Sequence, residues 1–106
     1  AKWVLNKNSN NTYAIQNVET QKVITLTSSQ NIGVNGNTII QSSNQGLTNQ
    51  RWYIVPIGNG YFKIMSMISG KALVVLNASS VDGAQIIQWS YEGSDVNDEW
   101  IFQQCD

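Results

Sequence analysis

The amino-acid sequence predicts an all-β protein. Its apolar residues fall in short clusters rich in β-branched and aromatic side chains, and turn-forming residues separate these clusters about every 10–12 residues. No stretch of the sequence shows a sustained apolar period of 3.6 residues, so no helix is expected. The 106 residues suit one compact domain, and 42% hydrophobic residues with four tryptophans can fill its core.

The apolar clusters mark the expected strands in order along the chain. They cover residues 3–5, 13–15, 23–24, 39–40, 52–55, 62–64, 73–75, 86–87 and 100–102. Turns are expected between them, at residues 6–11, 35–36, 58–60, 69–70, 82–83 and 92–93. Pro56 is expected to follow a strand rather than to interrupt one.

The sequence repeats itself. Trp3, Trp52 and Trp100 are 49 and 48 residues apart, and the residues between them align as well. Each repeating unit holds about four expected strands and must bury its apolar face against neighbouring units. A propeller needs at least about four blades, whereas this chain has two full units and one closing strand.

Charge and composition exclude several functions. Six basic residues against seven acidic ones give a net charge of −1, which disfavours nucleic acid as a partner. The chain has no histidine and one cysteine, so it cannot form Ser-His or Cys-His catalytic pairs or a histidine-ligated zinc site. No cofactor, metal site or catalytic residue is predicted. Cys105 has no internal disulfide partner; a free thiol is favoured over a bridge to another chain.

The apolar runs are too short for a membrane helix, which needs about 20 residues. No membrane insertion is therefore expected. The first residues, Ala1 to Trp3, do not read as a signal peptide, and the sequence is expected to be that of a soluble, mature domain.

Several ordered motifs point to one family. Asn49-Gln50-Arg51-Trp52 contains a Gln-x-Trp, and Ser-Gly-Lys at 69–71, Asp-Gly at 82–83, Ile-Gln-Trp at 87–89 and Asn-Asp-Glu-Trp at 97–100 follow in order. Over essentially its whole length the chain resembles the ricin-B-type β-trefoil lectins, also called the QxW family or carbohydrate-binding module family 13. The resemblance implies a β-trefoil of three four-strand units, of which this chain holds about two thirds.

The single lectin-like domain at 1–106 then divides into the end of a preceding repeat at 1–12 and two repeats at 13–60 and 61–106. A complete trefoil needs about 40 further residues upstream, or another chain or copy to complete the barrel.

The resemblance also implies where sugars bind. A family site combines a carboxylate, an aromatic ring that stacks on the sugar and an Asn-Gln pair. In the second repeat Trp89 takes the ring position and Asn97 the amide position, but Val74 replaces the carboxylate and Asp98 the glutamine. The polar residues best placed to join them are Asp82, Gln88 and Tyr91.

In the first repeat the amide pair is kept as Asn49 and Gln50, while Thr25 and Ser42 replace the carboxylate and the ring. The two asparagines of these sites have a second interpretation, because Asn near a turn readily bonds its own backbone. Trp89 also has two: it can stack on a sugar or pack beneath the loop at Tyr91.

Four carboxylates gather near the end of the chain, at Glu92, Asp95, Asp98 and Glu99. They lack the spacing of a calcium loop, so a solvated acidic turn is favoured. Nor is an acid and nucleophile pair for glycoside hydrolysis expected. The chain is therefore not expected to be an enzyme.

These observations predict a non-catalytic carbohydrate-binding module that targets a larger secreted protein, toxin or haemagglutinin to glycans outside the cell. Galactose-type sugars are candidate ligands, although the missing carboxylates disfavour them. The alternative is a β-trefoil that has lost sugar binding and serves as a structural or protein-interaction domain of a multi-chain assembly. An exposed Trp89 with polar neighbours favours the first, and a buried Trp89 the second.

Overall fold

The computed structural model describes residues 2–27, 33–75, 86–91 and 98–102. Within these ranges the regular elements are β-strands and one 3₁₀ turn, which confirms the all-β prediction. The elements are β1 (Trp3–Lys7), β2 (Tyr13–Asn17), β3 (Val23–Leu26), β4 (Ile39–Ser42), η1 (Thr48–Gln50), β5 (Trp52–Gly58), β6 (Tyr61–Ser66), β7 (Ala72–Val75) and β8 (Ile86–Trp89).

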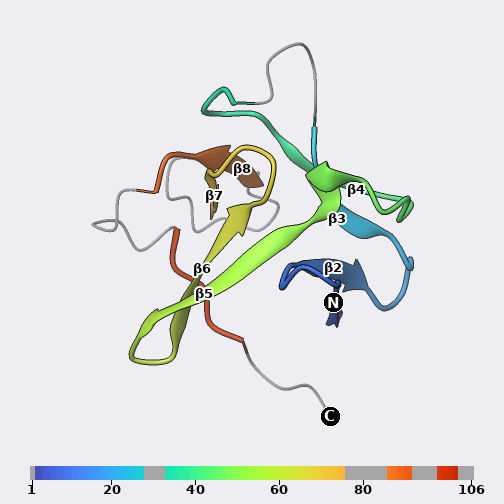
Figure 1. Ribbon diagram of the computed structural model, residues 1–106, viewed down its shortest axis with the longest axis horizontal. Coiled ribbons are helices and arrows are strands. Elements are labelled where there is room, and N and C mark those ends of the chain that lie inside the picture. Colours follow the sequence, from blue (N-terminus) through green and yellow to red (C-terminus); the bar gives the residue numbers. More distant parts are fainter. Residues whose placement is uncertain (1, 28–32, 76–85, 92–97, 103–106) are drawn as a thin grey trace.

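The strands form four antiparallel hairpins in one sheet that is nearly closed into a barrel (Figure 1). The order along the sheet is β4-β3-β2-β5-β6-β7-β8, and β1 pairs with β2 outside this path. The β5–β6 hairpin crosses the middle of the molecule, with β7 and β8 on one side and β3 and β4 on the other (Figure 1). The chain thus places two equivalent pairs of strands around a shared hairpin.

Three local predictions from the sequence need correction. Strand β1 continues to Lys7, where the sequence predicts a turn, because Lys7 still pairs with Tyr13 across the hairpin. Pro56 lies within β5, just before a register shift, and such irregular positions tolerate a residue without an N–H group. The strand expected at 100–102 is reduced to one bridge between Trp100 and Phe62, because no other described strand pairs with residues 101–102.

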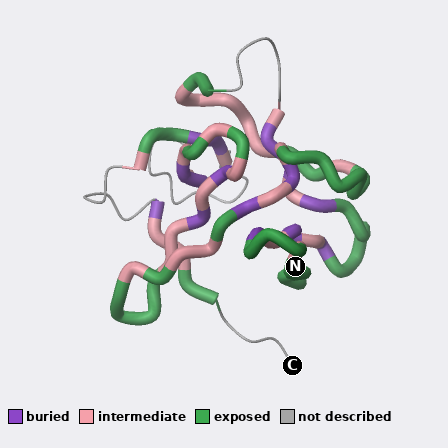
Figure 2. The backbone as a smooth tube through the Cα atoms, in the orientation of Figure 1, coloured by how far each residue is buried: buried purple, intermediate pink, exposed green. Residues whose placement is uncertain are grey.

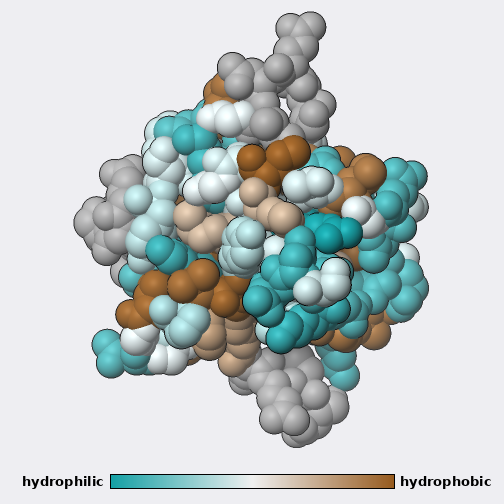
Figure 3. All heavy atoms as spheres, viewed as in Figure 1, coloured by the Kyte–Doolittle hydropathy of each residue, from teal (hydrophilic) through white to brown (hydrophobic). Residues whose placement is uncertain are grey.

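The core lies where the hairpins meet, and buried residues gather in the centre of the molecule in Figure 2. Trp52 is fully buried there, in contact with the apolar residues Ile15, Leu26, Ile64 and Leu73. Trp100 is half-buried against this cluster, but Trp3 is 44% exposed. The expectation that the tryptophans fill the core is therefore confirmed for Trp52 and wrong for Trp3. At the outer part of the β5–β6 hairpin hydrophobic residues also reach the surface (Figure 3).

The sequence repeat is also a repeat of hydrogen bonds. The amide of Asn17 donates to the carbonyl of Lys22 at 2.8 Å, and the amide of Ser66, 49 residues on, donates to Lys71 at 2.8 Å. Both turns contain a residue with positive φ, Gln21 at 65° and Gly70 at 71°. The glycine adopts this conformation without strain, whereas the glutamine is held there by the turn.

The described residues contain no helix that is long and apolar enough to span a membrane.

Candidate glycan-binding site

The amide of Gln50 lies inside the first repeat. Its Nε2 donates to the carbonyl of Ser43 at 2.8 Å and to Oγ1 of Thr25 at 3.3 Å. Its Oε1 accepts from the backbone amides of Gln45 at 3.0 Å and Leu47 at 3.3 Å. With 2% of its surface exposed, this side chain holds the turn ahead of η1 and does not face solvent.

The other candidate residues of the first repeat also bond to the protein. Asn49 donates from Nδ2 to the carbonyl of Leu26 at 2.9 Å, and Thr25 is buried and donates to the carbonyl of Val23 at 3.0 Å. Ser42, at the position of the ring, is half-buried. This repeat therefore has an internal polar network, and at its ring position it has a serine in place of an aromatic side chain.

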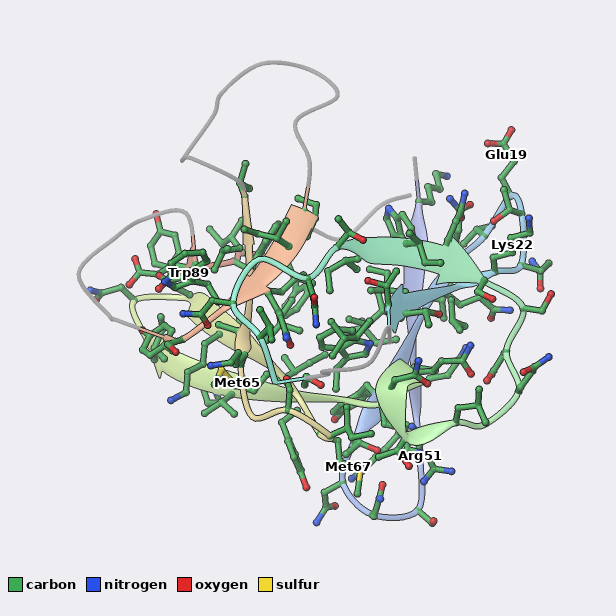
Figure 4. The ribbon with its side chains drawn as sticks, turned by 90° about the horizontal axis from the view of Figure 1, so that it is seen from above. Glu19, Lys22, Arg51, Met65, Met67 and Trp89 are labelled. Carbon is green, nitrogen blue, oxygen red and sulfur yellow. The ribbon has the colours of Figure 1, made fainter. Side chains whose placement is uncertain are left out.

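In the second repeat an exposed aromatic ring stands at the position that Ser42 holds in the first. Trp89 ends β8 and is 40% exposed (Figure 4). Its ring passes close to Gly36, where a Cβ on the glycine would lie 4.0 Å from the ring, and the φ of Gly36 is +96°, a conformation that glycine adopts readily. An indole that is supported on one side and open on the other can stack on the apolar face of a sugar.

Polar groups surround the end of β8. Oδ1 of Asn35 accepts from the amide of Ser90 at 3.0 Å, and Lys71 donates from Nζ to Oγ of Ser90 at 3.0 Å. Ser90 is exposed, and Asn35 and Lys71 are half-buried. These three residues place an amide, an ammonium and a hydroxyl next to the exposed indole, which are the groups that hydrogen-bond sugar hydroxyls.

Gln88 faces the interior, as expected for the residue before an exposed one in a strand. It is fully buried, donates from Nε2 to the carbonyl of Val34 at 2.7 Å, and accepts from Oγ of Ser69 at 2.7 Å. Its amide thus ties the chain at Val34 to β8, and the structure does not bring it to the open face of Trp89.

Tyr91 and Asp98 form a second polar region of this repeat. Tyr91 is half-buried, and Nζ of Lys63 lies 4.8 Å from the centre of its ring. Partial burial, together with the negative charges of Asp98 and Glu99, raises the pKa of the Tyr91 phenol above its ordinary value. Tyr91 therefore stays protonated at neutral pH and can donate its O–H.

Asp98 is 3% exposed, so the prediction of a solvated acidic turn is wrong for this residue. Within the described part of the chain its Oδ1 has no hydrogen-bond partner. Asp82, Asn97, Glu92, Asp95 and Cys105 lie outside the described residues. The described residues contain no group of three or more His, Cys, Asp or Glu side chains that could hold a metal ion.

The sequence does not single out Asn35, Lys71 or Ser90 as site residues. Asn35 belongs to the first repeat, yet its side chain bonds Ser90 of the second, 55 residues away. The Asn35-Gly36 pair predicts a turn, but only the fold shows that this turn packs against the second repeat.

The geometry defines the class of protein: hairpins repeated about a common core, with a tryptophan closing each repeat, make up a β-trefoil. A model of the family described as ricin-type beta-trefoil lectin domain-like matches residues 1–89. The chain belongs to this family. No curated protein sequence matches it.

Solved structures agree on the fold. A designed 3-fold symmetric protein, ThreeFoil, is 36% identical with a TM-score of 0.87, and the match covers 93% of this chain and 69% of that one. The exo-beta-1,3-galactanase 1,3Gal43A from Clostridium thermocellum is 32% identical with a TM-score of 0.84, covering 93% of this chain but 21% of the enzyme. A Polyporus squamosus lectin, solved with the epitope Neu5Aca2-6Galb1-4GlcNAc, is 24% identical with a TM-score of 0.80, covering 96% and 35%. This chain therefore spans about two thirds of the designed trefoil and a small part of the galactanase.

Proposed function

We propose that this chain is a non-catalytic carbohydrate-binding module whose sugar stacks on Trp89. The observation that carries the proposal is the exposed indole, which is 40% open and has Asn35, Lys71 and Ser90 beside it. A buried ring would have favoured a purely structural domain. Membership of a lectin-like family supports the same function.

The proposed site differs from the one that the family pattern implies. Val74 replaces the carboxylate and is 6% exposed, so it offers no acceptor to a sugar hydroxyl. Lys71 and Ser90 supply donors instead, at the end of β8 that carries Trp89. We therefore expect weak single-site binding, which attachment to a larger secreted protein, a toxin or a haemagglutinin at a cell surface would strengthen by multivalency.

The alternative function, a structural or protein-interaction domain, has its own supporting observation. The amides of Gln50 and Gln88 and the hydroxyl of Thr25 all bond inside the protein. A trefoil whose polar residues serve only its own fold would bind no sugar. Both functions also need the barrel to be completed by another chain, a second copy or a further repeat.

The test is a printed array of neutral, galactose-terminated and acidic glycans, followed by calorimetry with the glycans that bind. Trp89→Ala is compared with Tyr61→Ala, which removes an aromatic ring of similar exposure, 43%, at the far end of the β5–β6 hairpin. We expect binding to be lost in Trp89→Ala and kept in Tyr61→Ala. A folded wild-type chain that binds no glycan, or loss in both variants, would favour the interaction domain.

A further inference from the structure

The amide of Asn35, beside Trp89, has its acceptor occupied and its donor free. Oδ1 of Asn35 accepts from the backbone amide of Ser90 at 3.0 Å and from the Ser90 hydroxyl at 3.3 Å. A backbone amide can only donate, so the first bond fixes Oδ1 toward Ser90 and turns Nδ2 the other way. Nδ2 has no acceptor among the described residues, and it is therefore available to a ligand.

The hydroxyl of Ser90 is used in both directions, and its second partner is the ammonium of Lys71. Nζ of Lys71 donates to Oγ of Ser90 at 3.0 Å, and Lys71 makes no ion pair with a described carboxylate. Lys71 is half-buried, at the start of β7. An ammonium has three donors, so two donors and an unpaired positive charge remain at the end of β8.

The indole N–H of Trp89 is another free donor. Nε1 of Trp52, in the core, donates to the carbonyl of Ile24 at 3.1 Å. Nε1 of Trp89 has no acceptor in the described part of the chain, and the residue is 40% exposed. The ring can thus stack on a sugar with its face while its N–H is still able to bond the same ligand.

The acceptors of the second repeat are placed differently from these donors. Val74 stands where the family pattern has a carboxylate, and its side chain has no acceptor. Oδ1 of Asp98 is buried, and Oε1 of Gln88 accepts from Oγ of Ser69 at 2.7 Å in the interior. A ligand at the end of β8 therefore meets free donors, and these acceptors are closed to it.

We propose that the site on Trp89 selects saccharides that carry an anionic group over their neutral counterparts. The anion accepts from Nζ of Lys71 and Nδ2 of Asn35 while the sugar ring stacks on the indole. This inference rests on the proposed function, since it needs a sugar at Trp89, and it adds the class of sugar. A carboxylate of an acidic sugar and a sulfate ester are the two sources of such a group.

The charge of Lys71 decides the class of ligand. A sugar hydroxyl can also accept hydrogen bonds, so the free donors alone do not require an anion. A hydrogen bond from an ammonium to a carboxylate, however, is about twice as strong as one between neutral groups. We expect an acidic sugar to bind about tenfold more tightly than its neutral counterpart, the lower end for charged hydrogen bonds, because Lys71 is only partly shielded from solvent.

The first repeat supplies a matched control for this charge. Lys22 directly precedes β3 as Lys71 directly precedes β7, and the two lysines are 49 residues apart. Lys22 is exposed and lies far from Trp89 in Figure 4. Lys22→Met therefore removes the same charge from the chain without touching the site. An effect of net charge alone would be equal in Lys22→Met and Lys71→Met.

The test measures, by calorimetry on the full chain, the ratio of affinities within matched pairs of sugars. The pairs are galacturonic acid with galactose, sialyllactose with lactose, and a sulfated galactose with galactose. We expect a ratio of about ten in the wild type and in Lys22→Met, and of about one in Lys71→Met. Added salt should lower the wild-type ratio, because salt screens a partly exposed ion pair. The pair with the largest ratio identifies a carboxylate or a sulfate as the group that is bound.

A second variant tests the other donor. Asn35→Asp keeps an oxygen that accepts from the amide of Ser90, but it replaces the donor Nδ2 with a second carboxylate oxygen. We expect the ratio to fall below one, because the bound anion would then face a negative charge. This variant also tests the proposal if Lys71→Met does not fold, which circular dichroism shows.

The outcomes separate this proposal from the proposed function. Equal binding of acidic and neutral sugars, with both lost in Trp89→Ala, would overturn the preference for anions and leave the sugar-binding function standing. An equal fall of the ratio in Lys71→Met and Lys22→Met would do the same. A folded chain that binds no member of any pair would overturn both.

Discussion

The two repeats share one backbone pattern but use their polar residues in opposite ways. In the first, Gln50 makes four hydrogen bonds and fixes a turn, and Ser42 stands where a ring would be. In the second, Asp98 stands in place of the glutamine, its Oδ1 has no partner among the described residues, and Trp89 opens to solvent. The turns and the closing tryptophans therefore maintain the fold, while the polar positions are free to differ in function.

The two repeats also differ in what a buried polar residue contributes to stability. Gln50 and Asp98 are both buried, at 2% and 3%, yet only Gln50 has a full set of partners among the described residues. A buried polar group without a partner lowers stability, since it has lost its bonds to water. We therefore expect the first repeat to carry more of the stability and the second more of the binding.

The largest expected effect comes from the closing tryptophans. Trp52→Ala should lower the free energy of unfolding by about 3–5 kcal/mol, because it empties a fully buried site. Trp100→Ala should cost less, because Trp100 is half-buried. Urea denaturation followed by circular dichroism measures both, and equal losses would contradict the difference between the repeats.

The next effect concerns Gln50 and Asp98, which hold equivalent positions in the two repeats. Gln50→Ala should cost about 2–3 kcal/mol, because the amides of Gln45 and Leu47 lose their acceptor. Asp98→Ala should not lower the free energy of unfolding and should raise it slightly, since it removes a buried oxygen that has no partner in the described part of the chain. A large loss in Asp98→Ala would mean that this carboxylate supports the fold as Gln50 does.

The sequence predicts the fold well because the fold depends on features that repeat. The tryptophans at a spacing of 49 and 48 residues, the Asn-Gly turn and the alternation of strands and turns are local signals. The paired turns at Gln21 and Gly70 confirm the register of the repeat. The expectation of a buried tryptophan fails for Trp3 because β1, which begins with Trp3, pairs with β2 alone among the described strands.

The site is predicted less completely because it joins two repeats. Trp89 can be named from its motif, but the bond from Ser90 to Asn35 spans 55 residues and no local pattern signals it. Gln88 is a sequence candidate because it is polar and next to Trp89, and strand alternation turns it inward instead. The sequence pattern identifies the strand, but the side to which each side chain points is known only once the strands are paired in the sheet.

A prediction with a smaller expected effect on stability tests whether the hydrogen bond between Thr25 and Gln50 can be recreated in the second repeat. Thr25 and Gln50 bond at 3.3 Å, and the equivalent residues are Val74 and Asp98. Val74→Thr combined with Asp98→Gln should recreate that bond. A double-mutant cycle by urea denaturation should then give a favourable coupling of about 1 kcal/mol. A coupling of zero would show that the two repeats differ there in backbone as well as in side chains.

The smallest effect is electrostatic and concerns Tyr91. The charge of Asp98 is one of the causes that raise the pKa of the Tyr91 phenol, so Asp98→Asn should lower that pKa toward its ordinary value. Carbon-13 NMR of labelled tyrosine measures it, with Tyr91→Phe to assign the signal and Glu19→Gln, on a turn far from Trp89 in Figure 4, as the control carboxylate.

Because the folded state binds the phenolic proton more tightly than the unfolded state, the stability that Tyr91 contributes is present below pH 10.0 and is lost as the pH rises through the folded pKa. Because Asp98→Asn lowers the folded pKa of Tyr91, it should lower the pH at which this stability is lost, and Glu19→Gln should leave that pH unchanged. If both variants shifted the Tyr91 signal equally, the field at Tyr91 would come from the net charge of the chain and not from the buried carboxylate. The second repeat would then differ from the first in its exposed ring but not in the charge beside it.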